Sequence, residues 1–85
     1  MSYLWGMETV KLKKQPNGQY SVVELAPIGG RWVTVSRDMK LDKAEESLPR
    51  HQTFRDRKVA HLREVREELV NRYGADPQKF DPIVE

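Results

Sequence analysis

The sequence predicts an α+β fold: a three-stranded antiparallel β-meander, then a short helix, then a long C-terminal helix packed on one sheet face. Three observations indicate this class. A Pro-Asn-Gly turn separates two alternating segments, a β-branched segment follows a Gly-Gly break, and the apolar period becomes helical after Leu41. A chain of 85 residues is sized for one domain with a small core.

The first two strands are predicted from the segment KLKKQPNGQYSVVEL. Pro16 suits the first central position of a type I turn, Asn17 tolerates the next, and Gly18 can take the left-handed conformation that closes the hairpin. This turn predicts a register with three facing pairs: Leu12 and Val22, Lys14 and Tyr20, and Lys11 and Val23. One sheet face then carries the expected core residues Val10, Leu12, Tyr20 and Val22.

The third strand is predicted from RWVTVS, which follows the turn segment APIGG and is rich in β-branched residues. Because side chains alternate along a strand, Val33 and Val35 share one side, and Trp32 and Thr34 share the other. We expect the two valines to face the core. The N-terminal YLWGM segment has two interpretations, since it can pack back on the sheet or form an exposed anchor for a partner.

Two helix start signals follow, each with an acid three residues after the first residue: Asp42 with Glu45, and Thr53 with Asp56. The first predicts the short helix DKAEESL, which Pro49 is expected to end. The second predicts a long helix over Phe54–Tyr73, ended by Gly74 in a left-handed conformation. The domain is therefore expected to span residues 1–74, and residues 75–85 to form a loosely ordered tail.

The long helix carries a broad apolar stripe made of Phe54, Val59, Leu62, Val65, Leu69, Val70 and Tyr73. Arg55 and Lys58 interrupt that side in the first turns. Burying an unpaired charge costs roughly several kcal/mol, which disfavours these two side chains in a small core. We therefore expect the C-terminal two-thirds of the helix to pack on the sheet and its first turns to extend beyond the sheet. The overhang would present a cationic rim around an aromatic ring, with candidate partner-binding residues Arg50, Phe54, Arg55, Arg57 and Lys58.

This rim predicts docking on an acidic surface of a protein partner, favoured also by the helix dipole. A solvated face whose ion pairs only stabilise the helix is the competing interpretation. We expect a small non-enzymatic binding module of the accessory or inhibitor type, the kind of protein that phages and mobile elements often encode at this size. The apolar stripe exceeds what three short strands cover, which predicts a homodimer or a hetero-complex.

The alternative is a DNA- or RNA-binding protein that uses a basic sheet face together with the patch from Arg50 to Lys58. Its candidate residues are Lys11, Lys13, Lys14, Arg31 and Trp32. An aromatic ring among basic side chains suits base stacking with neutralisation of the phosphate backbone. A Trp32 covered by the short helix or by a dimer mate is the competing interpretation. Fifteen basic against thirteen acidic residues indicate nucleic acid only weakly.

Several classes of chemistry lack support in the sequence. The chain has no cysteine, which excludes disulfides and thiolate catalysis. His51 and His61 have no further ligands at suitable spacing, so no metal or cofactor is expected. No serine lies in a nucleophile motif, and we expect no enzyme. The N-terminus is not typical of a signal peptide, and no apolar run reaches about 18 residues, so a cytoplasmic protein with no membrane contact is expected.

The segment from Tyr20 to Leu48, with strand, strand and the helix KLDKAEESL, is similar in outline to the second half of a double-stranded-RNA-binding domain. It also resembles the three-stranded arm-binding domains of phage integrases. The lysine-rich helix start of the RNA-binding family is represented only by Lys40 and Lys43, which Glu45 and Glu46 follow. This difference removes the phosphate clamp, so no site residue is transferred from either family.

Overall fold

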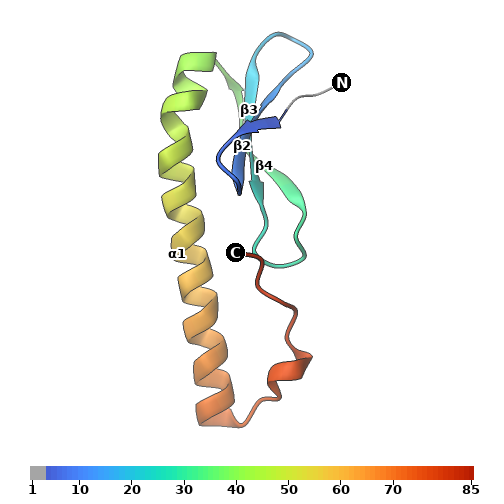
Figure 1. The fold of residues 1–85 in the computed structure, drawn as a ribbon, viewed down its shortest axis with the longest axis vertical. Coiled ribbons are helices and arrows are strands. Elements are labelled where there is room, and N and C mark those ends of the chain that lie inside the picture. The colour runs from blue at the N-terminus through green and yellow to red at the C-terminus, as the bar shows by residue number, and fades with distance from the viewer. Residues whose placement is uncertain (1–3) are drawn as a thin grey trace.

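The computed structural model describes residues 4–85 and has an α+β architecture (Figure 1). Four antiparallel strands pair in chain order to form one sheet, and one long helix follows them. The elements are β1 (Leu4–Gly6), β2 (Val10–Lys14), β3 (Tyr20–Leu25), β4 (Trp32–Met39), the helix α1 (Leu41–Tyr73) and the 3-10 helix η1 (Pro77–Lys79). The predicted class is confirmed, but the sheet has one more strand than expected and one helix takes the place of two.

The hairpin between β2 and β3 has the predicted register. Leu12 lies opposite Val22, and the flanking pairs match as well. Gly18 has a φ of 83°, and its N–H donates to the carbonyl oxygen of Gln15 at 3.1 Å. The turn therefore closes with the left-handed glycine that the Pro-Asn-Gly sequence predicts.

The additional strand β1 comes from the YLWGM segment, of which Tyr3 lies outside the described residues. Trp5 lies opposite Leu12, and its ring meets the ring of Tyr20 edge-on, with centroids 5.7 Å apart. Both rings pack against the core. From Leu4 onward, this segment thus extends the sheet, in agreement with the first of its two interpretations.

The helix α1 runs unbroken through Pro49, so the expected break into two helices is wrong. Proline removes a single N–H from the helix, the one that would donate to the carbonyl of Glu45. Pro49 itself is exposed, and the Thr53 hydroxyl donates to its carbonyl oxygen at 3.0 Å. The buried residues Ala44, Leu48, Arg55 and Val59 lie on both sides of the proline, and this packing outweighs its local cost.

The end of the helix that packs on the sheet is also the opposite of the one expected. Val10, Leu12 and Val22 form the core together with Ala44 and Leu48, which belong to the first turns of α1. The C-terminal half of the helix extends past the sheet (Figure 1). Small and branched residues at the start of α1 fit closely on the sheet, and their burial fixes this end of the helix against it.

The C-terminal segment folds back along the extended half of α1 (Figure 1). Gly74 has a φ of 67° and ends the helix as predicted. The Arg66 guanidinium then lies 5.2 Å from the centroid of the Phe80 ring. Further on, Ile83 forms a β-bridge with Ile28, and the Val84 N–H donates to the carbonyl oxygen of Pro27 at 2.8 Å. The segment expected as a tail therefore returns to the sheet and contacts its β3–β4 connection.

Candidate functional site

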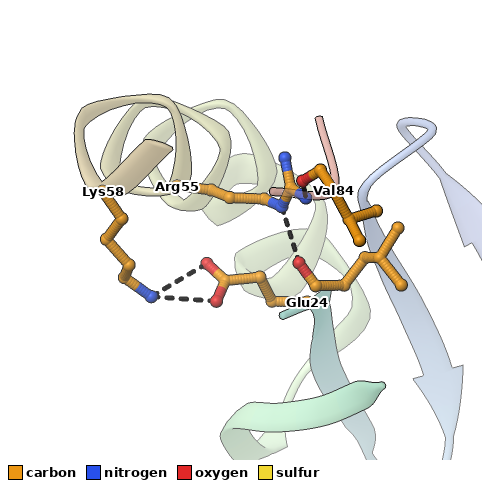
Figure 2. A network of polar contacts seen from close by, with 5 residues as sticks. Glu24, Arg55, Lys58 and Val84 are labelled. Carbon is orange, nitrogen blue, oxygen red and sulfur yellow. Dashed lines mark hydrogen bonds and ion pairs between the residues drawn. The ribbon is translucent and has the colours of Figure 1, made fainter. Parts of the chain in front are cut away.

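Arg55, a candidate for partner binding, lies in the interior with 1% of its surface exposed. Its Nε donates to the carbonyl oxygen of Leu25 at 2.7 Å, and its terminal nitrogen donates to the carbonyl oxygen of Val84 (Figure 2). The expectation that Arg55 stands on an exposed rim is wrong. The cost of burying its guanidinium is reduced, because two carbonyl oxygens accept hydrogen bonds from it. Both acceptors are about 30 residues away in sequence, so no local pattern indicates them.

Lys58 borders the same region and binds a buried carboxylate. Its Nζ lies 3.1 and 2.8 Å from the two carboxylate oxygens of Glu24, as Figure 2 shows. Glu24 is buried, whereas about half of the Lys58 side chain, 52%, is exposed. Sequence reasoning missed Glu24, although strand alternation places it on the core face with Tyr20 and Val22. An acid on that face requires a cation from the helix above it.

The other three candidates on α1 are exposed: Arg50, Phe54 and Arg57. Phe54 has 48% of its surface exposed and lies one helical turn from both His51 and Lys58. His51 points toward β4, where its Nε2 lies 3.3 Å from the Ser36 hydroxyl. Phe54 therefore belongs to the side of α1 that faces β4. Arg50 lines a depression with Met39 at the end of β4.

The strand β4 is the least covered element of the sheet. Trp32, Val33 and Val35 have 39%, 41% and 37% of their surfaces exposed. The expectation that both valines face the core is wrong. Val33 lies opposite Glu24 and so shares the sheet face that carries α1. The helix packs on β2 and β3, and one helix is narrower than four strands, so the β4 side of that face stays uncovered.

The outer edge of β4 is open. The Ala26 N–H donates to the Arg31 carbonyl oxygen at 2.8 Å, which marks a hydrogen-bonded pair at the start of the ladder. Because such pairs alternate in antiparallel sheets, Val33 bonds to Glu24, while Trp32 and Thr34 direct their N–H and C=O groups outward. Within the described part of the chain, no strand pairs with these groups.

A shallow groove of about 390 Å³ lies beside the start of β4, between α1 and the β3–β4 connection. Its walls are mostly apolar, and its lining residues are Glu24, Ala26, Pro27, Ile28, Lys58, His61 and Leu62. The groove continues the side of α1 that carries Phe54, since His61 lies two turns beyond it. Exposed Val33 of β4, the aromatic ring of Phe54 on α1 and the apolar groove thus lie on the sheet face that carries α1.

The opposite sheet face carries the candidate nucleic-acid residues. The Lys11 ammonium lies 5.5 Å from the centroid of the Trp32 ring, and strand alternation places Lys13 on the same face. Lys14 alternates to the other face, and Arg31 lies directly before β4. Trp32 is not covered by the helix, because α1 packs on the other side of the sheet. The structure therefore brings three of the five residues together on an open face.

Among residues 4–85, no three His, Asp or Glu side chains gather where they could hold a metal ion. No helix in this range combines the length and the apolar composition that a membrane crossing requires. A scan against protein-family models and searches of the curated proteins and of the solved structures found no match to this chain.

Proposed function

We propose that the chain is a non-enzymatic binding module that docks on an acidic protein through β4 and the facing side of α1. The observation that supports this most strongly is the exposure of Trp32, Val33 and Val35 on an eight-residue edge strand. Phe54 adds an exposed aromatic ring on the side of α1 that faces β4. Apolar and aromatic side chains grouped in this way are typical of the centre of protein interfaces.

The charges around this surface favour an acidic partner. Arg50 and Arg57 flank Phe54 on α1, and neither takes part in the ion pairs found among residues 4–85. On β4, Arg37 is exposed, while the neighbouring Asp38 accepts hydrogen bonds from the side chains of Gln15 and Asn17. Opposite charge across an interface steers association and selects the partner. The proposed interface therefore has an apolar centre and a cationic border.

The proposed binding residues differ from the initial candidates on α1 because two of those candidates are removed and three residues of β4 are added. Arg55 is committed to the interior and leaves the set. Lys58 neutralises Glu24, so its charge is already shared within the chain. Arg50, Phe54 and Arg57 remain, and β4 adds Trp32, Val33 and Val35. Changes at Arg50 and Arg57 can therefore test docking without disturbing the fold.

The test is capture of partner proteins by the tagged chain and by the variant Arg50→Glu/Arg57→Glu. Because both side chains are exposed, the variant should keep its melting temperature while losing a partner that the parent retains. The matched control is Arg72→Glu/Lys79→Glu, which makes the same change of charge at the far end of the molecule. Equal capture by parent and variant, or equal loss in variant and control, would argue against docking at this surface.

A second candidate function is nucleic-acid binding on the open sheet face, favoured by the Lys11 contact with Trp32. Bases that stack on Trp32 would quench its fluorescence. The substitution Trp5→Phe removes the other tryptophan, so that the signal comes from Trp32 alone. We expect Lys13→Ala and Trp32→Ala to weaken binding of single-stranded RNA or DNA, and the affinity to fall steeply with salt. If neither single-stranded RNA nor single-stranded DNA changes the fluorescence or shows a mobility shift at low salt, nucleic-acid binding is wrong.

A further inference from the structure

We propose that the acidic partner adds an extended strand to the outer edge of β4. This inference rests on the proposed function and specifies how the partner is recognised. Trp32 and Thr34 each direct one N–H and one C=O group outward, in the ladder alternation derived above. An incoming strand that pairs with these groups would extend the sheet from four strands to five and place its side chains next to the exposed side chains of β4.

The first part of the β4 edge, from Trp32 to Thr34, lacks the features that usually prevent strand addition. Exposed edges are commonly short, or are interrupted by proline or by a charge. β4 is the longest strand of the sheet, and its first four residues, Trp32–Val35, are all aromatic or β-branched. The other edge strand, β1, has only three described residues. β4 is irregular at two places, where the register with β3 shifts between Val23 and Val22 and again between Val22 and Tyr20, and both places follow the two open pairing positions at Trp32 and Thr34.

The cationic side chains near the edge of β4 favour an incoming strand that carries acidic residues. Side chains on one side of the incoming strand would lie next to Val33 and toward α1, which presents Arg50 and Arg57. Side chains on its other side would lie next to Trp32 and Thr34 on the open face. The expected partner segment therefore alternates acidic residues, directed toward α1, with apolar or β-branched residues directed toward the open face.

The same charges disfavour a second copy of this chain as the added strand. Residues 31–40 contain Arg31, Arg37 and Lys40 against the single acid Asp38. Pairing of β4 with another β4 would bring two cationic segments together, beside the cations of two copies of α1. Like charges placed opposite each other destabilise strand pairing. A partner strand of opposite charge avoids this repulsion.

The test uses peptides selected from a random twelve-residue display library on the immobilised full chain. We expect the selected peptides to alternate acidic and β-branched or apolar residues and to contain no proline at pairing positions. Thr34→Pro removes one outward N–H but no bond to β3, so it should weaken binding of a selected peptide about tenfold. Thr34→Ala keeps the N–H and should bind within about threefold of the parent.

Hydrogen exchange of the unaltered chain provides a readout that does not depend on the folding of Thr34→Pro. Binding of the peptide should slow exchange of the Trp32 and Thr34 amides. Unchanged exchange at both amides, selection of basic or helical peptides, or selection of none would overturn strand addition. A chain that sediments as a dimer and becomes monomeric on Thr34→Pro would also overturn it, because a second copy would then occupy the edge.

The same peptides separate this inference from the function on which it rests. If Arg50→Glu/Arg57→Glu abolishes binding while Thr34→Pro leaves it intact, the acidic partner docks on α1 and strand addition is wrong. If the charge variant binds the peptides as the parent does, the charge-directed docking proposed above is wrong. Loss of binding in both variants, with protection of the Thr34 amide in the parent, supports both.

Discussion

Arg55 on α1 and Leu25 at the end of β3 are joined by a hydrogen bond of 2.7 Å from the Arg55 Nε to the Leu25 carbonyl oxygen. A second bond runs from the same guanidinium to the carbonyl oxygen of Val84. One buried side chain thus links the helix, the sheet and the returning C-terminal segment (Figure 2). Arg55, which was expected to bind a partner, instead connects three parts of the fold.

The first prediction concerns Arg55→Met, which keeps most of the apolar stem but removes every donor. Two partly buried carbonyl groups would lose their hydrogen bonds, and a buried group that is left unsatisfied costs about 1–3 kcal/mol. We expect urea denaturation to show a free energy of unfolding about 2–5 kcal/mol lower. Arg57→Met, at an exposed position two residues away, should change it by about 0.5 kcal/mol or less. Equal effects would show that the guanidinium bonds do not stabilise the fold.

The second prediction concerns the pair formed by Lys58 and Glu24. Lys58→Met leaves a buried carboxylate without its cation, and we expect a loss of roughly 1–2 kcal/mol, reduced from the value for a fully buried pair because Lys58 is half exposed. In a Glu24→Gln background the same substitution should have little effect. A double-mutant cycle by chemical denaturation measures the coupling. A coupling energy near zero would contradict the pairing.

The third prediction is a pH dependence of stability. Burial lowers the pKa of His51 below its ordinary value of 6.5; the nearby Arg50 and Lys58 also lower it, and Glu24 opposes them. Between the two pKa values the unfolded chain binds more protons, so stability should be full above pH 6.5 and fall as the pH drops toward the folded-state pKa. His51→Gln should lose less stability than the parent between pH 7.5 and 5.5, measured by urea denaturation at each pH. The same loss in both proteins would exclude His51 as the source.

The fourth prediction follows from the unbroken path of α1 through Pro49. Pro49→Ala restores the missing N–H and removes a residue that costs about 3 kcal/mol relative to alanine inside a helix. Because the unfolded chain also gains freedom, we expect a net gain of roughly 1–2 kcal/mol in the free energy of unfolding. Thermal denaturation followed by circular dichroism measures it. A lower melting temperature would indicate that the proline stabilises this region instead.

The parts of the fold that local chemistry determines were predictable from the sequence. Pro16, Asn17 and Gly18 define one turn geometry, and a turn of known length fixes the strand register on both sides of it. The alternation on either side then selects the core face, because a slip by one residue would expose Leu12 and Val22. Gly74 ended the helix as expected for the same reason, since a left-handed residue requires no tertiary contact.

The features that depend on distant residues were not predictable in this way. Pro49 indicated a helix end, but burial of Ala44 and Leu48 on the sheet kept the helix continuous. Arg55 was expected to be exposed because no acceptor for its charge lies nearby in the sequence. Its two acceptors are about 30 residues away, and only the folded chain brings them close. The exposure of Val33 follows from the position of α1 over β2 and β3, which strand alternation does not determine. Of the candidate partner-binding residues on α1, Arg50, Phe54 and Arg57 are exposed and free of the contacts that hold Arg55 and Lys58.

The projection of α1 beyond the sheet makes the molecule an electric dipole about 50 Å long, the length of its longest axis. Residues 50–63 carry five cations and one acid, whereas residues 64–80, which precede the return to the sheet, carry three cations and four acids. The positive end coincides with the sheet, and the negative end with the projecting half of the helix. In the field of an acidic protein, such a dipole turns its sheet end toward the partner before contact. Added salt shortens the range of this torque, so it should slow association with an acidic partner more than it speeds dissociation.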